Sequence, residues 1–184
     1  MGLTIHYSGN FRRDQSLPGM ISEAVEFAKN HDWRFFLFDT DFPSEETQDG
    51  TEKETRVEPD NAPHYGVMLM PPECEPVHLY FDIERRLGFE SDLRQVTIES
   101  WVQEDDENGH WEREELPADY EPTWGAFTKT QWAGADVHLK VVQILKQLSE
   151  KYFSDFVVND ESDFWDHGDE KLLRERFGKG VMSE

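Results

Sequence analysis

Cysteine is almost absent from this chain of 184 residues, in which Cys74 stands alone. One cysteine cannot form a disulfide within the chain, and it cannot supply a cysteine-based zinc site. Basic residues are also few: 18 Lys and Arg stand against 40 Asp and Glu, which gives a net charge of −22. So acidic a chain does not attract nucleic-acid phosphates or anionic lipids, and both partners are disfavoured.

Long apolar runs are missing, and no stretch approaches the roughly 18 residues that a membrane-spanning helix needs. The first ten residues have neither the basic part nor the apolar part of a signal peptide. Glycine-rich phosphate loops, the HExxH zinc motif and the GxSxG nucleophile turn are absent as well. These absences predict a soluble, cytoplasmic protein without a cofactor, and they argue against an enzyme.

Aromatic residues, in contrast, are abundant, with 13 Phe, 6 Trp and 5 Tyr. Each ring can bury a large apolar area, so the chain can form a core in spite of its charge. A length of 184 residues suits one domain. We therefore expect a single folded domain over residues 1–184.

The negative charge is concentrated in three segments. Residues 39–63 carry nine carboxylates and two bases, residues 104–122 carry nine and one, and residues 155–170 carry seven and none. Together the three segments hold the whole net charge of −22. They are either solvated loops that maintain solubility or an acidic surface for a basic partner. Residues 39–63 also lack any periodicity, which predicts a mobile insertion.

Apolar residues at helical spacing predict two main helices and a short one. The first begins after Ser16 and ends near Asn30, and the second covers residues 135–153. A short helix over residues 169–177 is expected to end at Gly178, since glycine commonly ends a helix.

Alternating apolar and polar residues predict the strands. The expected strands are residues 3–8, 65–70, 77–81, 93–103, a return strand that begins at Trp111, and residues 156–158. Asn108 and Gly109 suit the turn of a hairpin before Trp111. Residues 33–38 are apolar on both faces, which predicts a central strand covered on both sides. Strands that follow one another between two main helices indicate an α+β fold, with a mainly antiparallel sheet and the two helices on one face.

Two histidines are candidates for chemistry. His138 lies at the edge of the apolar stripe of the long predicted helix, and His6 lies on the polar side of the first strand. His138 is either a partly buried structural histidine or a ligand or base, and His6 is either simply exposed or has one of these roles. With Asp160 or Glu161 they offer the donors that Zn²⁺ or Mn²⁺ accepts, but no spacing in the sequence points to a metal site.

The segment before the long helix, residues 129–134, combines Lys129 and Gln131 with the ring of Trp132. It is either a binding loop at a helix N-terminus or a helix entry with a packed tryptophan. Trp165 has the same ambiguity, although a place in the core is favoured. The glutamates beside Cys74 predict a raised thiol pKa and no nucleophilic role.

Three islands of the chain resemble a group of uncharacterised bacterial proteins. They are MGLTIHYS at residues 1–8, KTQWA at 129–133, and DE at 160–161 followed by FW at 164–165. The resemblance covers these islands and not the acidic segments. It implies a bacterial, cytosolic origin and no particular activity.

Three functions agree with these observations. The first is a non-enzymatic binding domain whose acidic surface takes a basic protein partner. The second is a small-molecule binder with a pocket lined by Trp132 and Trp165. The third is a metal-dependent hydrolase that uses His6, His138 and Asp160 or Glu161. We rank them in this order because the charge pattern is clear and catalytic motifs are missing.

Overall fold

The computed structural model describes residues 3–43, 64–91, 99–102, 110–113 and 123–180. The chain forms two compact units, residues 1–89 with 125–184, and residues 90–124. In the smaller unit, β6 (Glu99–Val102) pairs antiparallel with β7 (His110–Arg113), with Trp101 opposite Trp111. This pairing confirms the predicted hairpin, and its turn at residues 108–109 lies outside the described residues.

The described residues of the larger unit contain helices α1 (Leu17–Asn30), α2 (Ala135–Tyr152), α3 (Phe164–His167) and α4 (Glu170–Gly180). The remaining strands are β1 (Thr4–Phe11), β2 (Arg34–Leu37), β3 (Tyr65–Met70), β4 (Val77–Phe81), β5 (Phe89–Ser91), β8 (Thr123–Lys129) and β9 (Phe153–Asp160).

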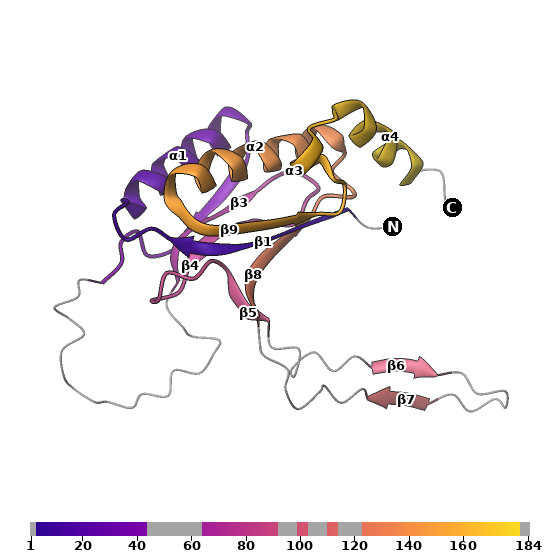
Figure 1. Cartoon of the computed structure of the whole chain (residues 1–184), viewed down its shortest axis with the longest axis horizontal. Coiled ribbons are helices and arrows are strands. Elements are labelled where there is room, and N and C mark those ends of the chain that lie inside the picture. The colour runs from indigo at the N-terminus through magenta and orange to yellow at the C-terminus, as the bar shows by residue number, and fades with distance from the viewer. Residues whose placement is uncertain (1–2, 44–63, 92–98, 103–109, 114–122, 181–184) are drawn as a thin grey trace. The chain divides into compact units, whose positions relative to one another are not determined.

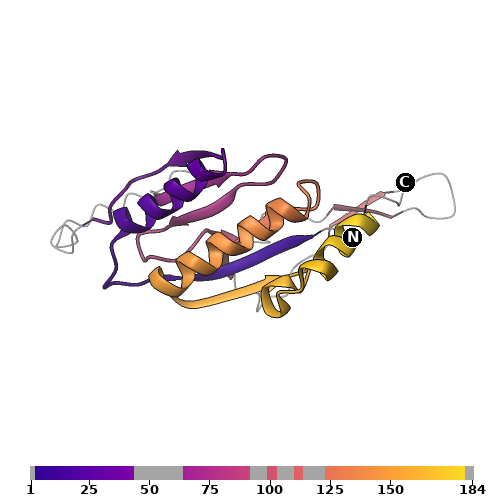
Figure 2. The ribbon, with the colours of Figure 1, turned by 90° about the horizontal axis from the view of Figure 1, so that it is seen from above.

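The strands form one sheet in the order β5-β8-β1-β9 and a second in the order β2-β3-β4. Neighbouring strands β8, β1 and β9 are antiparallel, and so are β2, β3 and β4. Helices α1 and α2 lie side by side on the same side of the sheets (Figures 1 and 2). The predicted α+β fold with two main helices on one face is confirmed.

Both main helices form where the sequence predicts them. The Ser16 hydroxyl caps α1 by accepting a hydrogen bond from the Gly19 amide (3.2 Å), and Pro18 suits the first turn. The stripe of α2 is buried as expected, because its apolar residues face the sheets. The buried residues of α2 also include His138, which is fully sealed from solvent.

A chain of hydrogen bonds, buried or partly buried, joins the two sheets. The His78 amide of β4 donates to the Tyr7 hydroxyl of β1 (2.8 Å), which lies 3.2 Å from the Thr128 hydroxyl oxygen of β8. Thr128 in turn donates to the Pro76 carbonyl oxygen (3.0 Å). Burial raises the pKa of Tyr7, so its phenol stays protonated and completes the chain.

The expectation of a central strand at residues 33–38 is wrong. Among the described residues, β2 pairs with β3 alone and forms an edge of its sheet. Phe35 packs against the core, whereas Phe36 is 53% exposed and Leu37 is 44% exposed. The sequence pattern of residues 33–38 shows that both faces of the strand are apolar, but it does not show what covers those faces.

Other boundaries also differ from the expectations. Strand β9 is longer than the predicted residues 156–158, and α3 was not expected. Helix α4 continues through Gly178 to Gly180, so the expected end at Gly178 is wrong. Of the predicted insertion 39–63, Phe42 packs on the core, while residues 44–63 lie outside the described residues.

Candidate functional site

Four polar side chains form a buried cluster where the three sequence islands meet. Thr130 precedes α2, His138 lies in its first turn, Asp160 ends β9, and Ser162 follows it. Strand β1 brings the islands together, because Ile5 pairs with Thr128 of β8 on one side and with Asp160 of β9 on the other. We call Thr130, His138, Asp160 and Ser162 the polar cluster.

The hydroxyl groups of Thr130 and Ser162 each donate a hydrogen bond to an oxygen atom and also lie next to His138. The Thr130 hydroxyl donates to the Leu3 carbonyl oxygen (3.1 Å), and its oxygen lies 2.8 Å from His138 Nδ1. The Ser162 hydroxyl donates to Asp160 Oδ2 (2.9 Å), and its oxygen lies 3.0 Å from His138 Nε2. The two hydroxyl oxygens therefore hold the His138 ring from both sides, one at each ring nitrogen.

The Asp160 carboxylate is held in its charged form. Burial alone would raise its pKa, but the hydrogen bond and charge of His138 and two hydrogen bonds from Ser162 outweigh burial and lower the pKa to about 2. The Trp165 amide also donates to Asp160 Oδ2 (3.0 Å). The carboxylate therefore anchors the start of α3 as well as the histidine.

The polar cluster has the order of a hydroxyl, imidazole and carboxylate relay, but it is closed to substrates. Thr130 and His138 are completely buried, and the side chains of Asp160 and Ser162 are nearly so. The Thr130 oxygen is also held against the backbone of Leu3. The polar cluster is therefore a structural tie between the start of the chain, the start of α2 and the end of β9.

The four residues considered for a metal site are divided between the interior and the surface. His138 faces Asp160 at 3.3 Å inside the protein, whereas the exposed His6 lies 3.9 Å from Glu161 Oε1. Within the described part of the chain, no group of three or more His, Cys, Asp or Glu side chains is arranged to hold a metal ion.

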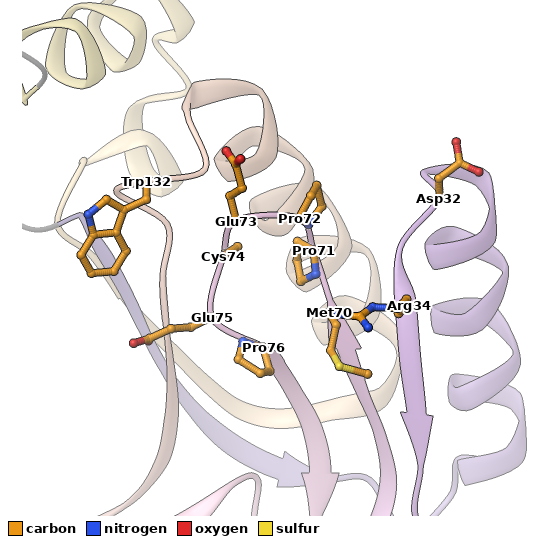
Figure 3. A pocket seen from close by; sticks show the side chains of 10 residues that line it. All are labelled: Asp32, Arg34, Met70, Pro71, Pro72, Glu73, Cys74, Glu75, Pro76 and Trp132. Carbon is orange, nitrogen blue, oxygen red and sulfur yellow. The ribbon is translucent and has the colours of Figure 1, made fainter.

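A pocket of about 610 Å³ lies at one end of the β2-β3-β4 sheet (Figure 3). The loop 71–76 lies between Trp132 on one side and Asp32 and Arg34 on the other (Figure 3). The residues that line it are Asp32, Arg34, Met70, Pro71, Pro72, Glu73, Cys74, Glu75, Pro76 and Trp132. We call it the Trp132 pocket.

The loop 71–76 of the Trp132 pocket is fastened to the end of β8. The Glu75 amide donates to the Lys129 carbonyl oxygen (3.3 Å), and the Lys129 amide donates to Glu75 Oε2 (3.0 Å). The Cys74 thiol points to the same carbonyl oxygen (3.5 Å). Burial, and then the charge of Glu75, raise the pKa of Cys74 to about 12, so the thiol is not a nucleophile at neutral pH, as the sequence predicted.

Trp132 presents an exposed ring to this pocket. The side chain is 65% exposed, which is unusual for so large an apolar residue. The ammonium of Lys129 lies 5.7 Å from the ring centre, within the range of a cation–π contact. Asp32, Glu73 and Glu75 line the pocket with three carboxylates, against the Arg34 guanidinium in the lining and the Lys129 ammonium at the Trp132 ring. The pocket is therefore suited to a ligand with a positive charge.

The structure places the remaining candidates elsewhere. Gln131 is half-buried in the loop next to Trp132 and does not line the Trp132 pocket. Trp165 does not line this pocket either. It packs against Phe156, and its ring contacts the Lys146 ammonium at 5.0 Å. The sequence suggested a pocket that Trp132 and Trp165 share. The residues that line the Trp132 pocket do not include Trp165.

The acidic segment 155–170 is largely used within the protein. Five of its seven carboxylates form hydrogen bonds or ion pairs, whereas Asp155 and Asp166 have no such partner among the described residues. The five are Asp160, Glu161, Asp163, Asp169 and Glu170. This segment therefore offers a partner few free carboxylates. The acidic segments 39–63 and 104–122 lie mostly outside the described residues.

Sequence reasoning missed most of the Trp132 pocket. The three prolines at 71, 72 and 76 indicated only a break between two strands. Arg34 falls within the predicted central strand, and Asp32 lies between the predicted helix and that strand. The single signal in the sequence was Trp132, a large ring among polar residues in a loop.

Among the described residues, no helix has the length and apolar character that crossing a membrane requires. Comparison of the chain with protein-family models, with curated proteins and with solved structures gives no match.

Proposed function

We propose that this protein is a non-enzymatic binding domain that holds a basic segment of a partner protein in the Trp132 pocket. The observation that carries the proposal is the exposed Trp132 ring in a pocket that three carboxylates also line. An arginine or lysine side chain can stack on the indole while its charge is neutralised by Glu73. The net charge of −22 attracts such a partner over a longer range.

Lys129 shows where a cation meets the ring. Its ammonium lies 5.7 Å from the centre of the Trp132 ring, so a basic side chain of the partner would take the place of Lys129 at the indole. A sealed polar cluster without access for a substrate, in contrast, gives no support to the hydrolase alternative.

The proposal is tested by calorimetric titration with tetra-arginine amide at low and physiological salt. We expect Trp132→Ala to weaken binding at least about tenfold, since a desolvated cation–π contact contributes up to about 2 kcal/mol. Val157→Ala is the matched control, because Val157 on β9 is 63% exposed and lies outside the pocket.

The role of local charge is tested with a second pair of variants. Glu73→Lys and Asp166→Lys change the net charge equally, but only Glu73 lines the pocket. Glu73→Lys is expected to weaken binding more than Asp166→Lys. Equal effects of the two variants, or binding that Trp132→Ala leaves intact, would show that the peptide is attracted by overall charge and not held in this pocket.

A further inference from the structure

The face of the β2-β3-β4 sheet opposite α1 carries a band of apolar side chains. Phe36 is exposed, Phe38, Met68 and Met70 are half-buried, and Tyr80 is buried. Val67 and Leu69 of β3 point to the buried side, so the alternating Met68 and Met70 point to the other side. We call this other side the open face. Its residues are Arg34, Phe36, Phe38, Met68, Met70, His78 and Tyr80.

The register of the strands arranges the open face in rows. Arg34 pairs with Met70 in the first row, and both line the Trp132 pocket. Phe36 pairs with Met68 in the second row, and Met68 pairs with His78. The open face is therefore continuous with the pocket.

Aromatic rings continue the band away from the pocket. The rings of Phe36 and Phe38 lie 5.1 Å apart, and those of Phe38 and Tyr80 lie 4.8 Å apart. These contacts hold the rings in place, so little conformational entropy is lost when a ligand packs on them. Met68 adds a flexible side chain that adapts to the shape of a ligand.

We propose that the open face binds apolar side chains of the same partner segment whose basic residue enters the Trp132 pocket. This inference rests on the proposed function and makes the ligand an amphipathic basic segment. Two observations select this occupant: the continuity of the open face with the pocket, and the net charge of −22, which opposes a second copy of the chain. Phe36, on an edge strand and 53% exposed, is the central contact.

The row spacing also predicts the pattern of the ligand. Side chains on one face of a strand recur every second residue, at about 6.6 Å. An extended ligand that runs along β2 therefore places a basic residue at the pocket and apolar residues two and four positions further on. Its pattern is Arg-x-Leu-x-Phe.

The test compares two peptides by calorimetry. One is acetyl-Arg-Ser-Leu-Ser-Phe-amide, and the other is acetyl-Arg-Ser-Gly-Ser-Gly-amide, which has the same charge. We expect the first to bind the wild-type protein at least about tenfold more tightly, because it buries apolar surface on the open face.

Substitutions in β2 then locate the gain in affinity. Phe36→Ser is expected to remove most of the gain for the apolar peptide and to leave the affinity for the glycine peptide unchanged. Leu37→Ser is the matched control, since Leu37 is 44% exposed but points to the other side of the same strand. Thermal unfolding of both variants verifies that they are folded.

The outcomes separate the two proposals. If both peptides bind equally, or if Phe36→Ser and Leu37→Ser act alike, the open face is not the docking surface, although the proposed pocket stands. If neither peptide binds the wild-type protein, the proposed function fails, and the inference built on it fails with it.

Discussion

The Oδ2 atom of Asp160 lies 3.3 Å from Nε2 of His138, and both side chains are sealed from solvent. The pair joins the end of β9 to the first turn of α2. A buried pair of this kind contributes to stability only when its other hydrogen-bonding groups are satisfied. Thr130 and Ser162 satisfy them in this protein, so the loss of one partner leaves the others buried and uncompensated.

Asp160→Asn is expected to lower the free energy of unfolding by about 2 kcal/mol at pH 7. The shift of the Asp160 pKa from 3.8 to about 2 corresponds to about that free energy, since one pKa unit is about 1.4 kcal/mol. Urea unfolding at pH 7 measures the loss. Asp166→Asn is the control, because the exposed Asp166 has no ion pair or hydrogen bond among the described residues, and we expect it to change stability by less than about 0.5 kcal/mol.

The effect of Asp160→Asn is also expected to depend on pH. The pKa of Asp160 is lower in the folded protein than in the unfolded chain, so its contribution is fully present above about pH 5. The contribution is lost as the pH falls through about 4 toward 2. Urea unfolding at pH 5, 4, 3 and 2 should therefore show the wild type and Asp160→Asn converging in stability. A difference that stays constant over this range would contradict the assigned pKa.

Thr130→Val is expected to destabilise the protein by about 1–3 kcal/mol, because valine keeps the shape but leaves the Leu3 carbonyl oxygen without the hydroxyl and His138 Nδ1 without its partner. Thr130→Ser keeps the hydroxyl and should restore most of the stability. Thermal unfolding of the two variants measures the difference. If Thr130→Val cost no stability while Thr130→Ser did, the methyl group of Thr130 and not its hydrogen bonds would be the stabilising feature.

The elements that could be predicted from the sequence are those whose signals are local. The pattern of 65–70 and 77–81 gave strands β3 and β4 with their correct bounds, and the stripe over residues 135–153 gave α2. The edge position of β2 could not be predicted, because its aromatic residues indicate two apolar faces and not what lies against them.

The sites could be predicted only in part, because each joins residues that are far apart in the sequence. His138 and Asp160 were identified as candidates, but the hydrogen bond that closes the polar cluster at Leu3 spans 127 residues. Trp132 was identified as well, whereas the loop that completes its pocket follows a different strand. The residue types in the sequence indicated the chemistry of these sites. The location of the polar cluster follows from the register of β1 with β8 and β9, which the sequence does not show.

Cys74 is expected to react slowly with thiol reagents in the folded protein. With a pKa of about 12, about one thiol in ten thousand is ionised at pH 8, against about a quarter of free cysteine. The more basic thiolate is more nucleophilic, which offsets part of this deficit. Labelling with iodoacetamide at pH 8 should therefore be at least about a hundredfold slower than in urea. Equal rates in the two conditions would contradict the raised pKa.

Gly178→Ala is expected to stabilise the protein by about 0.5–1 kcal/mol, because Gly178 lies inside α4 and glycine is a poor helix former. A Cβ atom at this position meets nothing within 4 Å, so no clash opposes the gain. Urea unfolding measures the change.

Gly168→Ala is the matched control for Gly178→Ala, since a Cβ atom there also meets nothing within 4 Å, but Gly168 ends α3 with a φ of +64°. Alanine at a left-handed position costs about 1 kcal/mol, so this variant should be destabilised. The two substitutions differ only in backbone conformation, and they are therefore expected to change stability in opposite directions. If Gly178→Ala destabilised the protein as much as Gly168→Ala, Gly178 would have the left-handed conformation of a helix end, and α4 would stop where the sequence first indicated.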